Sequence, residues 1–318
     1  MASSFEVSAQ TTLENGFIVA VAGRSANEIP KLEREELWQI GTTVISVLPS
    51  HNVVALFESL PGMSDVRTSA ESAIIAAHAV RNHYEKTKRP KIDSAMQAAR
   101  RAVSGATAGS LCVGTIVQVE TPSKKPHIRV INAGDTSVMA YDRTDRSKGS
   151  DGMLTYITTP QTEPYTFLLT NYLGQPNEHT PITTQDNVGD YELGSLNTVI
   201  CMASRKLFSK IGFDPSPEAW QFAAAYDDYP LFTDAVRANA LPERKSTGNF
   251  DWKVWEWIVP QLAKKGLTRK QITPSTIAMG LVQPPIYWRP QHSPSRGDAS
   301  LIMLAHPDYT PHAGSDAY

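Results

Sequence analysis

Two consecutive amphipathic helices lie between long runs of strand-like sequence, and this order limits the fold more than any other feature. The first helix is predicted to start at a capping box formed by Thr68 and Glu71, with small apolar residues following at helical spacing. The second is predicted to start with Asp93 as N-cap and to end at Gly105. Strand-like segments are expected at 16–22, 42–48, 53–57, 110–119, 127–132, 137–141, 196–203 and 299–305. Because strands and helices are grouped and do not alternate, the sequence predicts a layered α+β fold.

Composition limits the classes of function. Hydrophobic residues make up 41% of the 318 residues, which is typical of a globular protein with a substantial core. The net charge is −2, so the chain has no excess of positive charge, and neither nucleic acid nor an anionic membrane is expected as a partner. Cys112 and Cys201 lie in apolar strand-like segments and are expected to be buried free thiols. With no signal-peptide pattern and no apolar stretch of roughly 18 residues, the expected location is cytoplasmic.

The region 207–296 differs in amino-acid composition and pattern from the rest of the chain. It combines helix-like patterns, many prolines and most of the tryptophans, namely Trp220, Trp252, Trp255, Trp257 and Trp288. We expect one domain over residues 1–306 that contains 207–296 as a helical insert, followed by a tail at 307–318. The tryptophans are expected to form a small satellite core, and a partner-binding surface is the alternative.

A series of short polar motifs lies at the ends of the predicted strands. In chain order these are Arg24 with Asn27-Glu28, Glu58-Ser59 before a glycine turn, Gly109-Ser110, Gly134-Asp135, the segment 169–174, Ser204-Arg205 and Asp298. Each motif is short, but the order resembles that of the metal-dependent type-2C protein Ser/Thr phosphatase family over residues 15–305. The resemblance implies an antiparallel β-sandwich flanked by pairs of helices, with an active site at one edge of the sandwich.

In active members of this family, aspartates at strand ends hold two Mg²⁺ or Mn²⁺ ions, which activate a water that attacks phosphoserine or phosphothreonine. Hard divalent ions need several convergent oxygen ligands. Where the family has such carboxylates, this chain has Ile29, Glu58, Arg205 and Asp298. By the resemblance, Arg24 stands near the phosphate-binding arginine, and Ser59 takes the place of a glycine. Gly134 and Asp135 match a motif that is chiefly structural.

The sequence therefore favours a degenerate family member. We expect no catalytic residues and no bound metal, because Arg205 cannot lose its charge and would repel a divalent ion by several kcal/mol at an effective dielectric of about 20. The hypothesis is that Arg205 replaces the metal and pairs with Glu58, Asp298 or both.

On this interpretation the protein is a pseudophosphatase with a binding or regulatory role in Ser/Thr phosphorylation signalling. Its expected partner is a protein, and a phosphoprotein is one candidate. One alternative is an active phosphatase with a rebuilt Mg²⁺ or Mn²⁺ site using Glu28, Glu58 and Asp298. The other is a non-enzymatic interaction scaffold.

Overall fold

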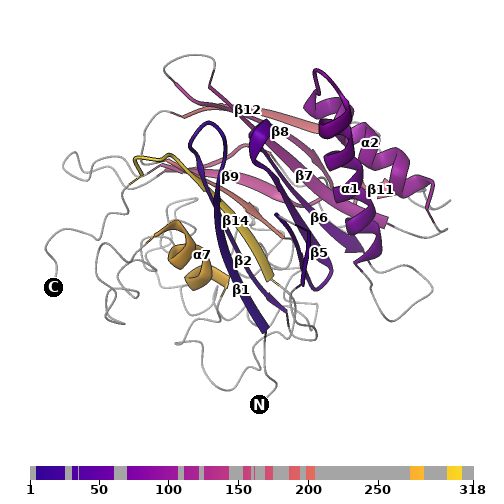
Figure 1. Ribbon diagram of the computed structural model, residues 1–318, viewed down its shortest axis with the longest axis horizontal. Helices are drawn as coiled ribbons and strands as arrows, with labels where there is room; N and C mark the ends of the chain where they lie inside the picture. The colour runs from indigo at the N-terminus through magenta and orange to yellow at the C-terminus, as the bar shows by residue number, and fades with distance from the viewer. Residues whose placement is uncertain are drawn as a thin grey trace, which may run out of the picture.

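Two antiparallel sheets face each other in this computed structural model, and a pair of helices covers one of them (Figure 1). The structure describes residues 5–25, 31–34, 36–60, 70–106, 111–121, 125–142, 153–158, 161, 169–174, 186–193, 198–204, 273–282 and 299–309. The α+β sandwich predicted from the sequence is thereby confirmed.

The smaller sheet has six strands. In spatial order they are β1 (Phe5–Thr12), β2 (Ile18–Ser25), β14 (Ala299–Ala305), β13 (Val199–Ala203), β9 (Ser137–Asp142) and β10 (Met153–Tyr156). Every neighbouring pair in this sheet is antiparallel. The last described strand, β14, therefore lies between β2 and β13, which joins the two ends of the described chain in one sheet.

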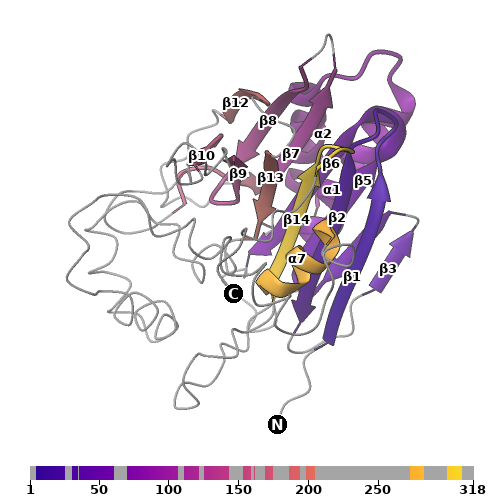
Figure 2. The same ribbon diagram turned by 90° about the vertical axis from the view of Figure 1, so that its left-hand side faces the viewer.

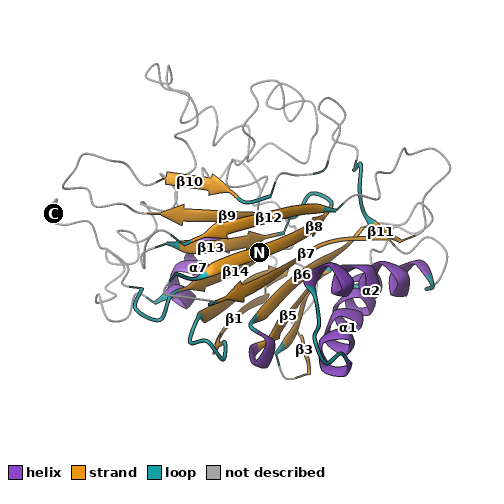
Figure 3. Ribbon diagram, turned by 90° about the horizontal axis from the view of Figure 1, so that it is seen from above, coloured by secondary structure: helices purple, strands orange, loops and turns teal. Residues whose placement is uncertain are grey.

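The larger sheet has eight strands. Its order is β12 (Asn187–Glu192), β8 (His127–Ala133), β7 (Leu111–Glu120), β6 (Val53–Leu60), β5 (Thr43–Leu48), β4 (Leu37–Ile40) and β3 (Lys31–Arg34), while β11 (Leu173–Gly174) pairs separately with β7. A short 3-10 helix, η1 (Pro49–His51), connects β5 to β6. Seen from above, the strands of the two sheets run in similar directions (Figure 3).

The predicted helix pair is confirmed as α1 (Glu71–Lys86) and α2 (Ile92–Ser104), which pack on the outer face of the larger sheet (Figure 2). Both predicted helix starts are wrong. Ala70 occupies the N-cap of α1, and Lys91 occupies that of α2, so that Asp93 lies inside the first turn. At α1 the capping bond comes from another element, because the Ala73 N–H donates to Ser59 Oγ on β6 at 3.0 Å. Gly105 ends α2 as predicted.

Strand alternation divides the apolar side chains between two cores. In β6, Val54 and Leu56 pack between the sheets, whereas Val53, Ala55 and Phe57 pack under the helix pair. The predicted burial of Cys112 and Cys201 as free thiols is confirmed.

Most of the predicted insert at 207–296 lies outside the described residues, as does most of the tail at 307–318. Within the insert region the structure describes α7 (Pro274–Val282), which packs on β2 and β14 on the opposite side of the molecule from α1 and α2 (Figures 1 and 2). Among the described helices, none combines the length and apolar character that a bilayer span requires.

Candidate functional site

Polar side chains collect at one end of the space between the sheets. On the larger sheet, Glu58 on β6 lies between Thr43 on β5 and the apolar residue Val113 on β7, and these three residues form the first row. On the smaller sheet, Ser300 pairs with Gly23, and the Ser204 N–H donates to Ser300 O at 3.0 Å. A Cβ atom on Gly23 would overlap the side chain of Ile40, which pairs with Thr43, so the two rows lie at the same end of the sandwich.

Glu58 is the carboxylate of the first row. It follows Val54 and Leu56 on the inner face of β6 and is only 4% exposed. The next residue, Ser59, points to the other face, where Ser72 Oγ donates to its Oγ at 2.8 Å. Burial and then the negative charge of Glu58 raise the pKa of Cys112, on the neighbouring strand. Both the Glu58 side chain and the Cys112 thiol lie where solvent access is low.

The predicted Gly134-Asp135 motif is the tight connection by which the chain passes from β8 in one sheet to β9 in the other. Gly134 has φ +105°, and a Cβ there would lie 2.3 Å from Val113 Cγ1, so only glycine fits without strain. Asp135 is 7% exposed. Because Val113 pairs with Glu58, this connection belongs to the same end of the sandwich as Glu58.

Next to this connection lies a buried group of polar side chains that sequence reasoning missed. Thr115 Oγ1 and Thr136 Oγ1 both donate to Asn132 Oδ1, at 2.5 and 2.6 Å. Asn132 Nδ2 donates to Gly134 O at 2.9 Å. The strand pattern of Thr115 gave a partial signal, because a polar residue among inward-facing apolar ones needs a buried partner.

Arg24 is also nearly buried, at 7% exposure, but it occupies a different face. It pairs with Glu6 on β1 and Ala299 on β14, in the position after Gly23. Because Gly23 faces inward toward Ile40, alternation directs Arg24 to the outer face of the smaller sheet. The structure therefore brings Glu58 and the Gly134-Asp135 connection together and leaves Arg24 on the other side of its strand.

Glu28, Arg205 and Asp298 lie outside the described residues, so their predicted roles stay predictions. Among the residues that are described, no group of three or more His, Cys, Asp and Glu side chains is arranged to hold a metal ion. Two hard divalent ions need several convergent oxygen ligands. Glu58 and Asp135 are the buried carboxylates that the structure describes at this end, and two carboxylates alone do not make such a set.

The fold and this carboxylate-bearing end define a two-sheet α+β protein with a candidate site at the edge of its sandwich. No protein-family model and no curated protein matches the sequence. Among solved structures, the chain is similar to the PPM Ser-Thr phosphatase MsPP from Mycobacterium smegmatis, crystallised with cacodylate (11% identity, 95% of this chain and 97% of that one, TM-score 0.43).

Two further similar structures are of the same kind. Serine-threonine phosphatase 2C from Toxoplasma gondii is 9% identical over 96% of this chain and 99% of that one, with a TM-score of 0.49. The catalytic domain of the phosphatase PstP, solved with two manganese ions, is 12% identical over 91% and 98%, with a TM-score of 0.43. The α+β fold class follows from the sheets and helices described above.

Proposed function

We propose that this protein is a pseudophosphatase: a type-2C phosphatase-like scaffold that binds or regulates a protein partner in Ser/Thr phosphorylation signalling. The position of Glu58 carries the proposal. It is a buried carboxylate at one end of the sandwich. The other described residues of the two sheets at that end include Thr43 and Val113 on the larger sheet and Ser300 and Ser204 on the smaller sheet. Hydroxyl and apolar groups in these places support a packed edge in preference to a two-ion centre.

The sequence on either side of the described edge supports the same conclusion. Ile29 and Arg205 stand where the resemblance implies carboxylates, and Arg205 directly follows Ser204. A guanidinium a few ångströms from a divalent ion costs several kcal/mol even at an effective dielectric of about 20. In this proposal the same guanidinium pairs with Glu58, because an opposite charge offsets part of the cost of burying a carboxylate. In this proposal Arg205 takes the place of the metal.

A hydrolysis assay combined with thermal melting tests the proposal. Wild-type protein is assayed with p-nitrophenyl phosphate and with a phosphothreonine peptide, with and without Mn²⁺. We expect no turnover above buffer and no Mn²⁺-dependent rise in Tm, because Ile29 and Arg205 stand where the resemblance implies metal-binding carboxylates. Arg205→Ala should lower Tm, because it removes a positive charge that would offset the buried Glu58 carboxylate.

If Mn²⁺-dependent turnover is observed, a matched pair of carboxylate variants shows whether it comes from this site. Glu58→Gln removes the buried carboxylate of the site, while Glu85→Gln removes a carboxylate on α1 whose side chain is 50% exposed. Mn²⁺-dependent turnover that disappears in Glu58→Gln and survives in Glu85→Gln would refute the pseudophosphatase proposal.

The retained burial of Glu58 favours one second candidate, an active phosphatase in which Glu28, Glu58 and Asp298 hold a single Mg²⁺ or Mn²⁺. A carboxylate at 4% exposure keeps the low-dielectric setting in which a bound ion acts strongly. This candidate requires turnover that is lost in Asp298→Ala. Stabilisation by Mn²⁺ without turnover would instead indicate a binding site for the ion alone.

A further inference from the structure

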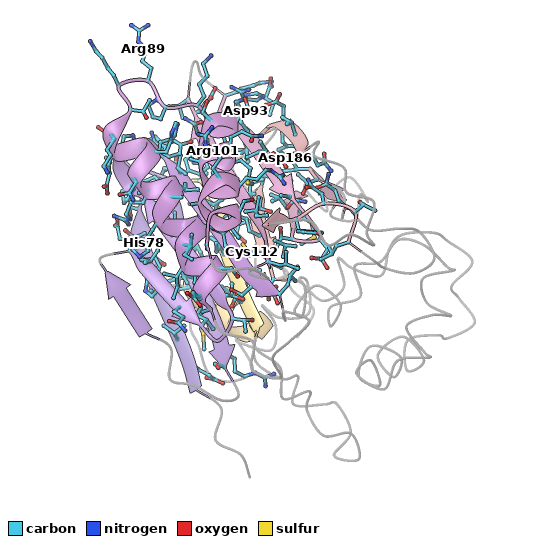
Figure 4. All side chains as sticks on the ribbon, turned by 90° about the vertical axis from the view of Figure 1, so that its right-hand side faces the viewer. His78, Arg89, Asp93, Arg101, Cys112 and Asp186 are labelled. Carbon is cyan, nitrogen blue, oxygen red and sulfur yellow. The ribbon has the colours of Figure 1, made fainter. Side chains whose placement is uncertain are left out.

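A side chain on α2 bonds three residues in two other segments of the chain. Arg100 Nη1 donates to Tyr172 O at 2.7 Å, and Nη2 donates to Asn171 Oδ1 at 3.2 Å. Nη2 also forms an ion pair with Asp186, which lies beside the helix pair (Figure 4). Arg100 therefore fixes both the segment around β11 and the start of β12 against the helix.

From Asn171 the hydrogen bonds continue inward to the candidate edge. Asn171 Nδ2 donates to Gln161 Oε1 at 3.0 Å and to Asp186 Oδ1 at 3.1 Å. Gln161 in turn holds Gly134 on both sides, because its Oε1 accepts the Gly134 N–H at 3.0 Å and its own N–H donates to Gly134 O at 2.9 Å. A continuous path of hydrogen bonds thus joins Arg100 to the connection that carries Asp135.

Stability alone does not account for this arrangement. The side chains of Arg100 and Asp186 are 15% and 6% exposed, and desolvation of a buried ion pair offsets much of its attraction. Arg100 Nε is buried and has no hydrogen-bond partner among the described residues, which adds a further cost. Apolar side chains in place of both Arg100 and Asp186 would fill these positions without these costs. The specific gain from arginine is the planar fork that bonds several acceptors in fixed directions.

We propose that Arg100 is a positioning residue that acts through Asn171 and Gln161 to hold the Gly134-Asp135 connection, and with it the shape of the binding edge beside Glu58. The inference rests on the proposed function only in taking this edge as the binding surface. It assigns to α2 a role in site geometry that neither the sequence motifs nor the proposed loss of metal requires.

Hydrogen exchange of backbone amides tests the proposal in the full-length protein without any ligand. In Arg100→Met we expect the Gly134 and Gln161 amides to exchange about tenfold faster, the change that the loss of one strong hydrogen bond produces. Arg81→Met is the matched control: Arg81 Nη2 also donates to a backbone carbonyl, Val47 O at 3.1 Å, but it lies on α1 and away from this path. The control should leave the Gly134 and Gln161 amides unchanged.

Two additional variants keep the test decisive if Arg100→Met folds poorly. Arg100→Lys retains the charge beside Asp186 but cannot bond three acceptors in a plane, so it should speed exchange at Gly134 with little change in Tm. Asn171→Leu removes the next link of the path, the hydrogen bond from Asn171 to Gln161. If the path is serial, the double variant Arg100→Lys/Asn171→Leu exchanges no faster at Gly134 than Asn171→Leu alone.

Two outcomes would overturn the proposal. The first is equal acceleration of all amides, including that of Val119, which bonds Asn52 O at the opposite end of the sandwich, because that indicates a general loss of stability. The second is additive effects of the Arg100 and Asn171 variants. The pseudophosphatase proposal is independent of either result, since it is decided by turnover and Mn²⁺ binding.

Discussion

Replacement of Gly134 by alanine should destabilise the protein more than any other single methyl addition at a described glycine near the site. Gly134 has φ +105°, a conformation that costs a residue with a side chain about 1–3 kcal/mol. The new Cβ would also lie 2.3 Å from Val113 Cγ1 and 2.7 Å from Val113 Cβ. Val113 is fully buried and β-branched, so its methyl group cannot turn away freely.

The expected loss is the sum of two effects. Overpacking of a filled interior costs about 1–3 kcal/mol, which together with the backbone strain gives a total of about 4 kcal/mol. That is a large part of the roughly 5–15 kcal/mol by which domains are stable. Gly105→Ala is the control, because Gly105 has φ −85° at the end of α2 and its nearest Cβ contact is at 3.3 Å. Its effect should stay within about 1 kcal/mol.

Urea unfolding followed by circular dichroism measures both variants. In the double variant Gly134→Ala/Val113→Ala the shortest contact disappears while the backbone strain remains, so the two changes should be coupled by about 1–2 kcal/mol. If Gly134→Ala and Gly105→Ala lose the same free energy of unfolding, the reasoning from φ and the Val113 contact is refuted.

Two further predictions concern titratable groups. Burial, and then the charge of Arg101, lower the pKa of His83, so the unfolded chain takes up the proton at a higher pH and stability should fall as pH drops below about 6.5. Urea midpoints between pH 8 and pH 5 should show this loss, and His83→Gln should reduce it; an unchanged slope in the variant would contradict the assignment. Burial raises the pKa of both Cys112 and Cys201, so neither thiol should react with a disulfide reagent at pH 8 until urea unfolds the protein. Rapid labelling of the native protein would contradict their burial.

The elements of the fold could be read from the sequence because their signals are local. Strand alternation and helical spacing repeat over a few residues, and Gly105 marks a helix end by its own chemistry. The start of α1 could not be read in this way, because its capping oxygen belongs to Ser59 on a strand earlier in the chain. A local pattern at Thr68 and Glu71 matched the usual signature, but tertiary packing supplied the cap.

The site was only partly predictable for the same reason. Glu58 and the Gly134-Asp135 motif were found because each follows a strand in a recognisable order. The hydrogen-bond path through Gln161, Asn171 and Asp186 joins polar residues that carry no spacing signal. The one sequence signal for this hydrogen-bond path was that Asn171 belongs to the ordered motif at 169–174.

The end of β6 explains how the packing of the strand fixes the orientation of Glu58. Phe57 points under the helix pair, where it fills the space that a Cβ on Gly114 would need. Glu58 then points between the sheets, and Ser59 points back to cap α1. A shift of one residue would bury the carboxylate under the helices and remove the cap, so the register is strongly specified. The packing of Phe57 and Ser59 is therefore sufficient to aim Glu58 at the edge of the sandwich.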